Sequence, residues 1–101
     1  MNPFKKALNS FTNDIASIYL HHESTFDWES FHGRFHILRC LYLAKAIITY
    51  YNKKVINIDE TKVYHAIMFH DSARKDNGID AWEKESALNC YNYLVKNNYT
   101  K

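Results

Sequence analysis

The chain has 101 residues and a mass of 12.0 kDa, with 47% hydrophobic residues, which suits one compact domain. It contains two Gly and one Pro, and this shortage of turn residues argues against an all-β sandwich or barrel. The formal net charge of +2 is too small to attract nucleic acid or an anionic membrane by itself. We therefore expect a single all-α domain over residues 1–101, a compact bundle of about four to five helices.

Two features of the chain predict a cytoplasmic protein. Cys40 and Cys90 are far apart in apolar helical patterns, as expected of reduced core thiols. The first residues begin an amphipathic run and lack the apolar core of a signal peptide. The longest apolar stretch, residues 37–51, is interrupted by Arg39 and Lys45, so we expect no membrane span.

The amino-terminal part predicts one helix followed by a loop. Apolar residues recur at steps of three and four over residues 3–20, which predicts an amphipathic helix. Residues 21–30 lose that period and are typical of a connecting loop. We expect Phe26 and Trp28 of this loop to fold back onto the core.

Three further helices are expected. The second runs from residue 31 or 33 to residue 51, and its nearly continuous apolar content predicts the central, most buried helix. Asp59 can cap a third helix that ends near residue 71, and Asp80 can cap a fourth after the polar loop 72–78. Asp80 and Glu83 are alternatively a cap and a first-turn acid or part of a substrate site.

Two histidines four residues apart open the second helix. His32 and His36 lie on the same helical face, so both imidazoles can point into one cavity if the helix already includes His32. In the alternative interpretation, one histidine caps the helix and the other is a hydrogen-bonded core residue. An isolated HxxxH pattern favours this alternative.

A His-Asp pair ends the third helix. His70 and Asp71 point in different directions within a helix, but both can reach a common centre from its final turn. The alternative is a plain helix end, in which His70 interacts with the negative end of the helix dipole. An upstream histidine on a buried helix and this pair, considered together, favour a shared site.

Other polar residues carry weaker signals. His21 and His22 could join a metal site, but their polar loop favours solvated side chains. His65 faces elsewhere on the third helix, as a structural or exposed residue. Trp82 is either a core residue or a pocket wall on which a base or ribose could stack.

The upstream His and the later His-Asp doublet resemble the HD superfamily of metal-dependent phosphohydrolases and phosphodiesterases. The resemblance implies an all-α, HD-like bundle in which His36, His70 and Asp71 bind a divalent transition metal, such as Mn, Fe, Ni or Zn. The metal would activate water against a nucleotide-type phosphate ester. Arg39 and Arg74 would hold the phosphate oxygens through paired hydrogen bonds.

A narrower resemblance rests on three islands, FHGRFH at residues 31–36, AIMFHDSAR at 66–74 and DNGIDAWEKES at 76–86. They are similar to the phosphodiesterase domain of the SidE-type effectors and related phosphoribosyl-ubiquitin hydrolases. That family splits the phosphoanhydride of ADP-ribosylated ubiquitin and does not require a metal.

The narrower resemblance implies roles for individual residues. His32 or His36 would be the nucleophile or its neighbour, and His70 would support the attack. Arg74 would bind phosphate, and Asp80 and Trp82 would contribute to substrate binding. The implied partners are a nucleotide or ADP-ribosyl-type substrate and ubiquitin, in the cytosol of a host cell if the chain is a secreted effector.

The resemblance covers about residues 31–86, which correspond to the amino-terminal half of these domains. HD enzymes carry a further Asp, and the SidE-type domain a further His, downstream of the matched positions, so we expect a truncated HD-like domain. Three interpretations stay open. A separate chain supplies the other half, a homodimer lends the missing ligand, or the domain is catalytically inactive and binds a nucleotide, ubiquitin or a partner chain.

Overall fold

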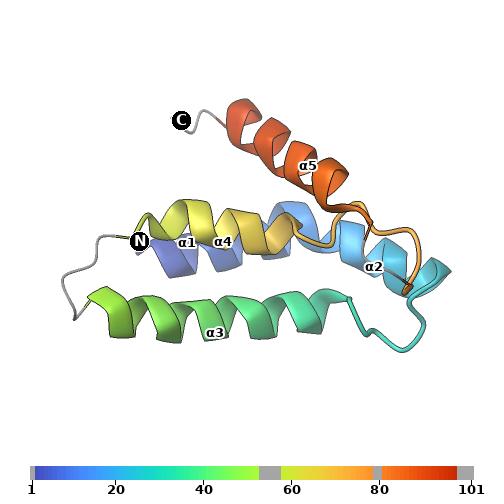
Figure 1. The fold of residues 1–101 in the computed structure, drawn as a ribbon, viewed down its shortest axis with the longest axis horizontal. Helices are drawn as coiled ribbons and strands as arrows, with labels where there is room; N and C mark the ends of the chain where they lie inside the picture. The colour runs from blue at the N-terminus through green and yellow to red at the C-terminus, as the bar shows by residue number, and fades with distance from the viewer. Residues whose placement is uncertain (1, 53–57, 79–80, 98–101) are drawn as a thin grey trace.

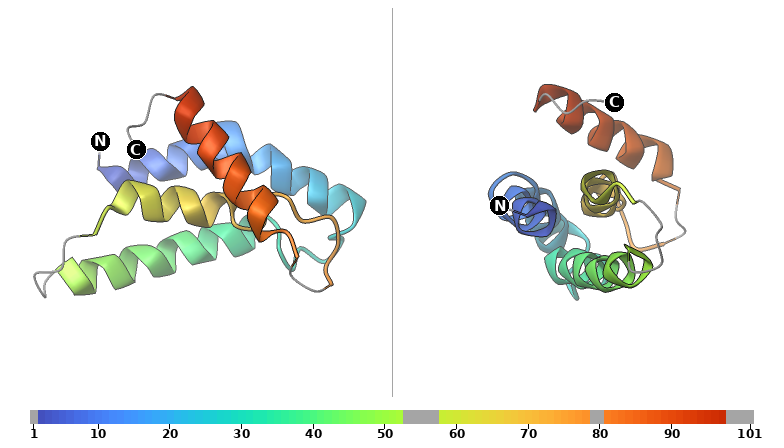
Figure 2. Two further views of the ribbon diagram at one scale, coloured as in Figure 1. Left: turned by 45° about the horizontal axis from the view of Figure 1, so that its top comes forward. Right: turned by 90° about the vertical axis from the view of Figure 1, so that its left-hand side faces the viewer.

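All regular secondary structure in the described parts of the chain is helical. The computed structural model describes residues 2–52, 58–78 and 81–97. They form α1 (Pro3–Ser10), the π turn η1 (Phe11–Ile15), α2 (Ala16–Thr25), α3 (Arg34–Asn52), α4 (Glu60–Phe69) and α5 (Glu83–Lys96). α1, η1 and α2 follow one another as one rod, and no strand occurs within these residues (Figure 2). The prediction of an all-α bundle is confirmed.

α4 is the central helix of the bundle. It lies between α3 and α5 and crosses in front of α1 (Figure 1), and it contacts all three. The end-on view in Figure 2 shows the amino-terminal rod, α3 and α4 around a common axis, with α5 outside them. This arrangement places the carboxyl end of α4 beside the start of α3 and the start of α5.

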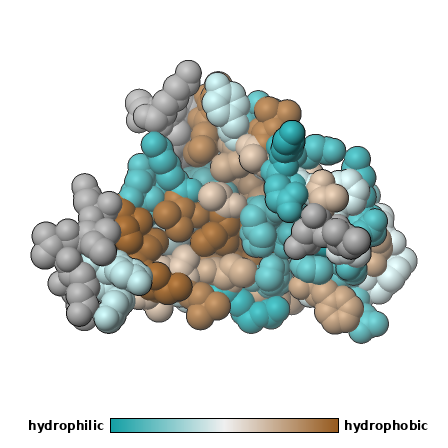
Figure 3. Space-filling view, viewed as in Figure 1, coloured by the Kyte–Doolittle hydropathy of each residue, from teal (hydrophilic) through white to brown (hydrophobic). Residues whose placement is uncertain are grey.

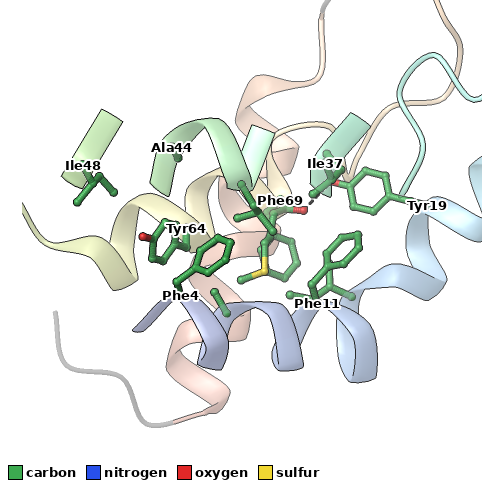
Figure 4. Close-up of a cluster of buried hydrophobic side chains, with 12 residues drawn as sticks. Phe4, Phe11, Tyr19, Ile37, Ala44, Ile48, Tyr64 and Phe69 are labelled. Atoms are coloured by element: carbon green, nitrogen blue, oxygen red, sulfur yellow. Dashed lines mark hydrogen bonds between the residues drawn. The ribbon is translucent and has the colours of Figure 1, made fainter. Parts of the chain in front are cut away.

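Buried side chains from the rod, α3 and α4 form the core (Figure 4). They are spaced three or four residues apart along each helix, except for the adjacent Met68 and Phe69, so each helix turns one apolar stripe inward. The core residues are Phe4, Ala7, Phe11, Ile15, Tyr19, Ile37, Leu41, Ala44, Ile48, Tyr64, Met68 and Phe69. The hydroxyl of Tyr19 donates a hydrogen bond to the carbonyl oxygen of Met68 at 2.6 Å, which fixes α2 against the last turn of α4.

The prediction of a helix that begins at residue 31 or 33 and ends at residue 51 is confirmed in outline, but the prediction that it is the most buried helix is wrong. α3 forms as expected, but it buries only one stripe. Phe35, Tyr42 and Leu43 are each more than half exposed, because no helix among the described residues covers that side of α3. None of the described helices is long and apolar enough to cross a membrane.

The first helix continues beyond the predicted end at residue 20. α2 ends at Thr25, so His21 and His22 are helical and do not lie in a loop. His22 is buried, because it follows Tyr19 by three residues and shares its inward face. Trp28 is 74% exposed, so the expectation that it folds onto the core is wrong, whereas Phe26 is partly buried against the ring of His22.

Of the two predicted helix caps, Asp59 and Asp80, only Asp59 lies within the described residues. Asp59 caps α4, because its side chain accepts a hydrogen bond from the backbone N–H of Lys62 at 3.2 Å. α5 begins at Glu83, and Trp82 occupies the capping position without a side-chain hydrogen bond to the helix. The expected cap, Asp80, lies outside the described residues.

Glu23 of α2 caps the start of α3. Its carboxylate accepts hydrogen bonds from the backbone N–H and from Nε of Arg34, both at 2.9 Å, and from Nη2 of Arg34 at 3.0 Å. Gly33 makes this approach possible, because a Cβ there would lie 2.8 Å from a Glu23 carboxylate oxygen. One carboxylate therefore satisfies a helix amino terminus and pairs with a guanidinium.

We expect Glu23→Gln to lower the free energy of unfolding by about 1–2 kcal/mol at neutral pH, chiefly through the weakened cap. The side chain of Arg34 is 37% exposed, so solvent screening limits the contribution of the ion pair. The hydrogen bonds of Arg34 hold the pKa of Glu23 below its ordinary value. The stability that Glu23 contributes is therefore present above its unfolded-state pKa and is lost as the pH falls through the folded-state pKa.

Urea unfolding of wild type, Glu23→Gln and the exposed control Glu29→Gln between pH 3 and pH 7 measures this difference. The Glu23→Gln deficit should shrink towards low pH, and Glu29→Gln should follow wild type. Equal stabilities for all three proteins at pH 7 would show that Glu23 does not stabilise α3.

Candidate active site

A buried carboxylate positions the turn that leads into α3. Asp27 is fully buried, and its two oxygens accept hydrogen bonds from the backbone N–H groups of Phe31 and His32, each at 2.9 Å. The turn also contains Ser30 with a φ of 58°, in the left-handed region that non-glycine residues seldom adopt. These contacts fix the backbone at His32 just before the helix.

Asn77 connects this turn to the loop that follows α4. Its side-chain amide donates to Asp27 Oδ1 at 3.0 Å, and its Oδ1 lies 2.8 Å from Nδ1 of His32. Because the amide oxygen is an acceptor, Nδ1 of His32 carries the proton in this arrangement. The loop after α4 thus sets the orientation of the His32 ring.

Asp71 is the centre of the histidine cluster. Its Oδ2 lies 3.3 Å from Nε2 of His36 and 3.2 Å from Nε2 of His70. The ring centres of His36 and His70 are 5.4 Å apart, and those of His32 and His36 are 5.6 Å apart. The structure therefore brings together the four residues for which the sequence predicts a catalytic role, His32, His36, His70 and Asp71.

Arg74 holds Asp71 from the other side. Its Nη2 and Nε lie 3.3 and 3.4 Å from Asp71 Oδ1, and its Nη1 donates to the carbonyl oxygen of Asp76 at 3.2 Å. The Arg74 side chain is 2% exposed. A phosphate oxygen would have to replace these contacts to reach Arg74, so in this structure the guanidinium positions Asp71.

The surroundings of the cluster shift its three acid–base groups in different directions. Burial lowers the pKa of His36, and the attraction of Asp71 only partly opposes this. The hydrogen bond to Asp71 raises the pKa of His70 more than burial lowers it. Burial raises the pKa of Asp71, but the hydrogen bond from His70 and the nearby positive charges outweigh it and set the pKa at about 2. The site therefore combines a carboxylate with two imidazoles whose pKa values are shifted in opposite directions, that of His36 downwards and that of His70 upwards.

The tautomer of His70 follows from its place at the end of α4. Its Nδ1 lies 2.6 Å from the carbonyl oxygen of Ile67, which leaves Nε2 directed towards Asp71. The carbonyl is one of the groups at a helix end that lack a partner within the helix. The helix end thus aims Nε2 of His70 at Asp71.

A hollow of about 140 Å³ opens beside the cluster and is lined by His70, Asp71, Arg74, Trp82 and Glu83. Trp82 is partly buried and forms one wall, with Nζ of Lys75 5.6 Å from its ring centre. This volume suits a phosphate group more than a whole nucleotide, because drug-sized ligands occupy roughly 300–1,000 Å³.

The predicted phosphate-binding residue Arg39 is not part of this hollow. Arg39 is exposed on α3 and lines a separate hollow with Phe35, Leu38, Tyr42 and Leu43. Its charge still reaches His36, whose pKa it helps to lower. Asp80 lies outside the described residues.

The donor set of the cluster fits a metal ion in two ways. An ion bound to nitrogen and oxygen ligands at about 2.1 Å places neighbouring ligand atoms roughly 3 Å apart, close to the distances from Asp71 to His36 and His70. In addition, His36, Cys40 and His70 each offer a ligand atom within 4.8 Å of the others. Both sets share the two histidines.

Asp27, Asn77 and Cys40 are the site residues that the sequence analysis did not identify. Asp27 and Asn77 lie in polar turn segments, where their composition predicts solvent exposure. Cys40 follows His36 by four residues, and this spacing on one helical face was the available signal.

Comparison of the chain with protein-family models, with curated proteins and with solved structures gave no significant match. The site is therefore interpreted from its own geometry and chemistry.

Proposed function

We propose that the chain is an HD-like phosphohydrolase or phosphodiesterase that cleaves a nucleotide-type phosphate ester or phosphoanhydride at the cluster around Asp71. One observation supports this most strongly. The start of α3 and the end of α4, 34 positions apart from His36 to His70, place two imidazoles against one buried carboxylate, and the ring of His32 lies next to that of His36. This arrangement supports the interpretation of the HxxxH and His-Asp patterns as parts of one HD-like site.

The two histidines on Asp71 have complementary roles in this proposal. His36 provides an uncharged nitrogen, which takes the proton of the water that attacks phosphorus. His70 provides an N–H, which stabilises charge on the phosphate and protonates the leaving oxygen. Asp71 touches both rings and keeps them in these orientations, as a carboxylate does for a catalytic histidine.

A divalent ion, when bound, would be held by His36, His70 and Asp71 and would supply activated water and neutralise phosphate charge. The residues fit such an ion, as the distances around Asp71 indicate.

The substrate class follows from the size and polarity of the hollow. A volume of about 140 Å³ beside His70 accommodates a phosphoryl group, and the ring of Trp82 offers a face on which a ribose or base can stack. The most specific candidate that the sequence motifs suggest is ADP-ribosylated ubiquitin, in which a pyrophosphate joins two riboses.

We expect His36→Ala and His70→Ala each to reduce turnover by about 100-fold or more, because each removes a proton-transfer group. The assay follows release of nitrophenol from bis(p-nitrophenyl) phosphate, and of AMP from ADP-ribose and ADP-ribosylated ubiquitin, with and without added Mn²⁺. His21→Ala is the matched control, because His21 is exposed on α2 and lies outside the cluster.

Circular dichroism of the three variants establishes that each keeps its helices. The proposal fails if His36→Ala and His70→Ala both turn over substrate at the wild-type rate. It also fails if folded wild type releases no product from any of these substrates.

A second candidate function is supported by the outer face of α3. This face carries five apolar side chains that are more than half exposed, namely Phe35, Tyr42, Leu43, Ile47 and Tyr50, and Phe31 in the turn before the helix is equally exposed. Arg39 is the one charged residue among the exposed positions of α3, and a hollow of about 570 Å³ lies between the side chains. On the face shown in Figure 3, hydrophobic side chains gather over α3 and α4. Apolar patches of this kind mark contact sites, so the alternative is a catalytically inactive HD-like domain that binds a partner chain.

The simplest partner for a face with so little charge is the same face of a second copy. We expect the double variant Leu43→Lys, Ile47→Lys to be monomeric in sedimentation equilibrium, at concentrations where wild type forms dimers. Leu88→Lys on α5 is the control, because Leu88 is equally exposed but lies elsewhere. A wild type that is monomeric at all concentrations would exclude self-association through α3.

A further inference from the structure

Cys40 lies one helical turn beyond His36, on the same side of α3. Its Sγ lies 4.0 Å from Nδ1 and 3.9 Å from Nε2 of His36. His70 completes the group, since one ligand atom from each of the three residues lies within 4.8 Å of the others. The function proposed above gives Cys40 no role.

We propose that His36, Cys40 and His70 bind a thiophilic transition metal ion of the Zn²⁺ class. A thiolate and two imidazoles are the donors that such ions prefer, whereas Mn²⁺ and Mg²⁺ prefer carboxylate, carbonyl and water oxygens. A tetrahedral Zn²⁺ ion needs ligand atoms roughly 3.5 Å apart. The three side chains reach this separation by moving together by up to about 1 Å, which is feasible because His70 stands at a helix end with 41% of its side chain exposed.

The hydrogen bonds around the two histidines orient them for this ion. His70 Nδ1 is engaged by the carbonyl oxygen of Ile67, so Nε2 is the nitrogen available to a metal. Asp71 lies beside Nε2 of His36 at 3.3 Å, so Nδ1 is the nitrogen of His36 that is available to a metal, and a rotation of the ring would turn it towards Cys40, whose Sγ is about equally far from both nitrogens. Metal-binding histidines commonly have their second nitrogen held by a carbonyl or carboxylate in this way.

Binding releases protons to solvent and changes the state of the active site. The Cys40 thiol loses its proton as the metal–sulfur bond forms, and the metal replaces the proton on Nε2 of His70. Both imidazoles used for proton transfer are then occupied. An ion held by His36, Cys40 and His70 also takes the two histidines that an ion beside Asp71 would need. It therefore inhibits turnover, and this consequence, unlike the site itself, rests on the proposed function.

The binding test uses Co²⁺ as a spectroscopic probe and Zn²⁺ as its competitor, on protein without a polyhistidine tag. Wild type should bind one Co²⁺ per chain, with a thiolate-to-cobalt charge-transfer band in the near ultraviolet that Zn²⁺ abolishes. Cys40→Ser should lose this band and weaken binding by more than roughly 100-fold, because loss of even an outer-shell partner costs about 10–100-fold.

Cys90→Ser is the matched control. Cys90 is the other cysteine of the chain, is also partly buried, and lies on α5 outside the three-residue group. It should bind Co²⁺ as wild type does. Cys40→Ala provides a second variant if Cys40→Ser loses helicity, and both should behave alike.

The outcome of the binding experiment does not depend on any enzyme assay. The site is disproved if wild type gives no thiolate band, or if the band persists in Cys40→Ser or disappears in Cys90→Ser. Inhibition is measured separately, as Zn²⁺ should slow wild type at lower concentration than Cys40→Ser. Equal inhibition of the two proteins would disprove the regulatory consequence, while a bound metal without turnover in any sample would refute only the proposed function.

Discussion

The arrangement of the site depends on burying the charge of one carboxylate, Asp71. Its side chain is 9% exposed, and a carboxylate in such a position is costly unless its oxygens have charged or hydrogen-bonding partners. The partners come from three places: His36 on α3, His70 at the end of α4, and Arg74 in the loop beyond it. Satisfying this one group therefore fixes the end of α4 against the start of α3, and it holds two imidazoles within reach of each other.

Polar contacts of two further residues, Tyr19 and Asp27, help to hold this arrangement in place. The Tyr19 hydroxyl donates a hydrogen bond to the carbonyl oxygen of Met68 in the last turn of α4. Burial raises the pKa of Tyr19, and the negative charge of Asp71 raises it further. The phenol therefore stays a neutral donor. Asp27 holds the backbone before α3 and also accepts a hydrogen bond from Asn77. Hydrogen bonds thus connect the turn before α3 with the loop after α4, and a site held by packed and hydrogen-bonded side chains keeps its polar groups in a fixed arrangement.

The sequence predicts what depends on local spacing and misses what depends on distant partners. The inward stripes of α3 and α4 and the cap at Asp59 follow from periodicity and from residue type, and the spacing of His32, His36 and His70 predicts their shared site. Residues 21–25 belong to the predicted loop 21–30 but are helical, because their polar side chains serve tertiary contacts: His22 packs against Phe26, and Glu23 caps another helix. The sequence predicts a phosphate ligand in Arg74, since nothing in a single sequence shows that Asp71 already pairs with it. For the same reason the apolar pattern predicts that the exposed side of α3 is core.

Imidazole titration by NMR tests most directly whether Asp71 organises the two histidines. The spectra are recorded in chelator-treated wild type and in Asp71→Asn, a substitution that keeps the shape of the side chain but removes its charge. Because the hydrogen bond to Asp71 is the main cause that raises the pKa of His70, the pKa of His70 should fall in Asp71→Asn, and that of His36 should fall further below its ordinary value. An unchanged His70 pKa in folded Asp71→Asn would contradict the central role given to this carboxylate.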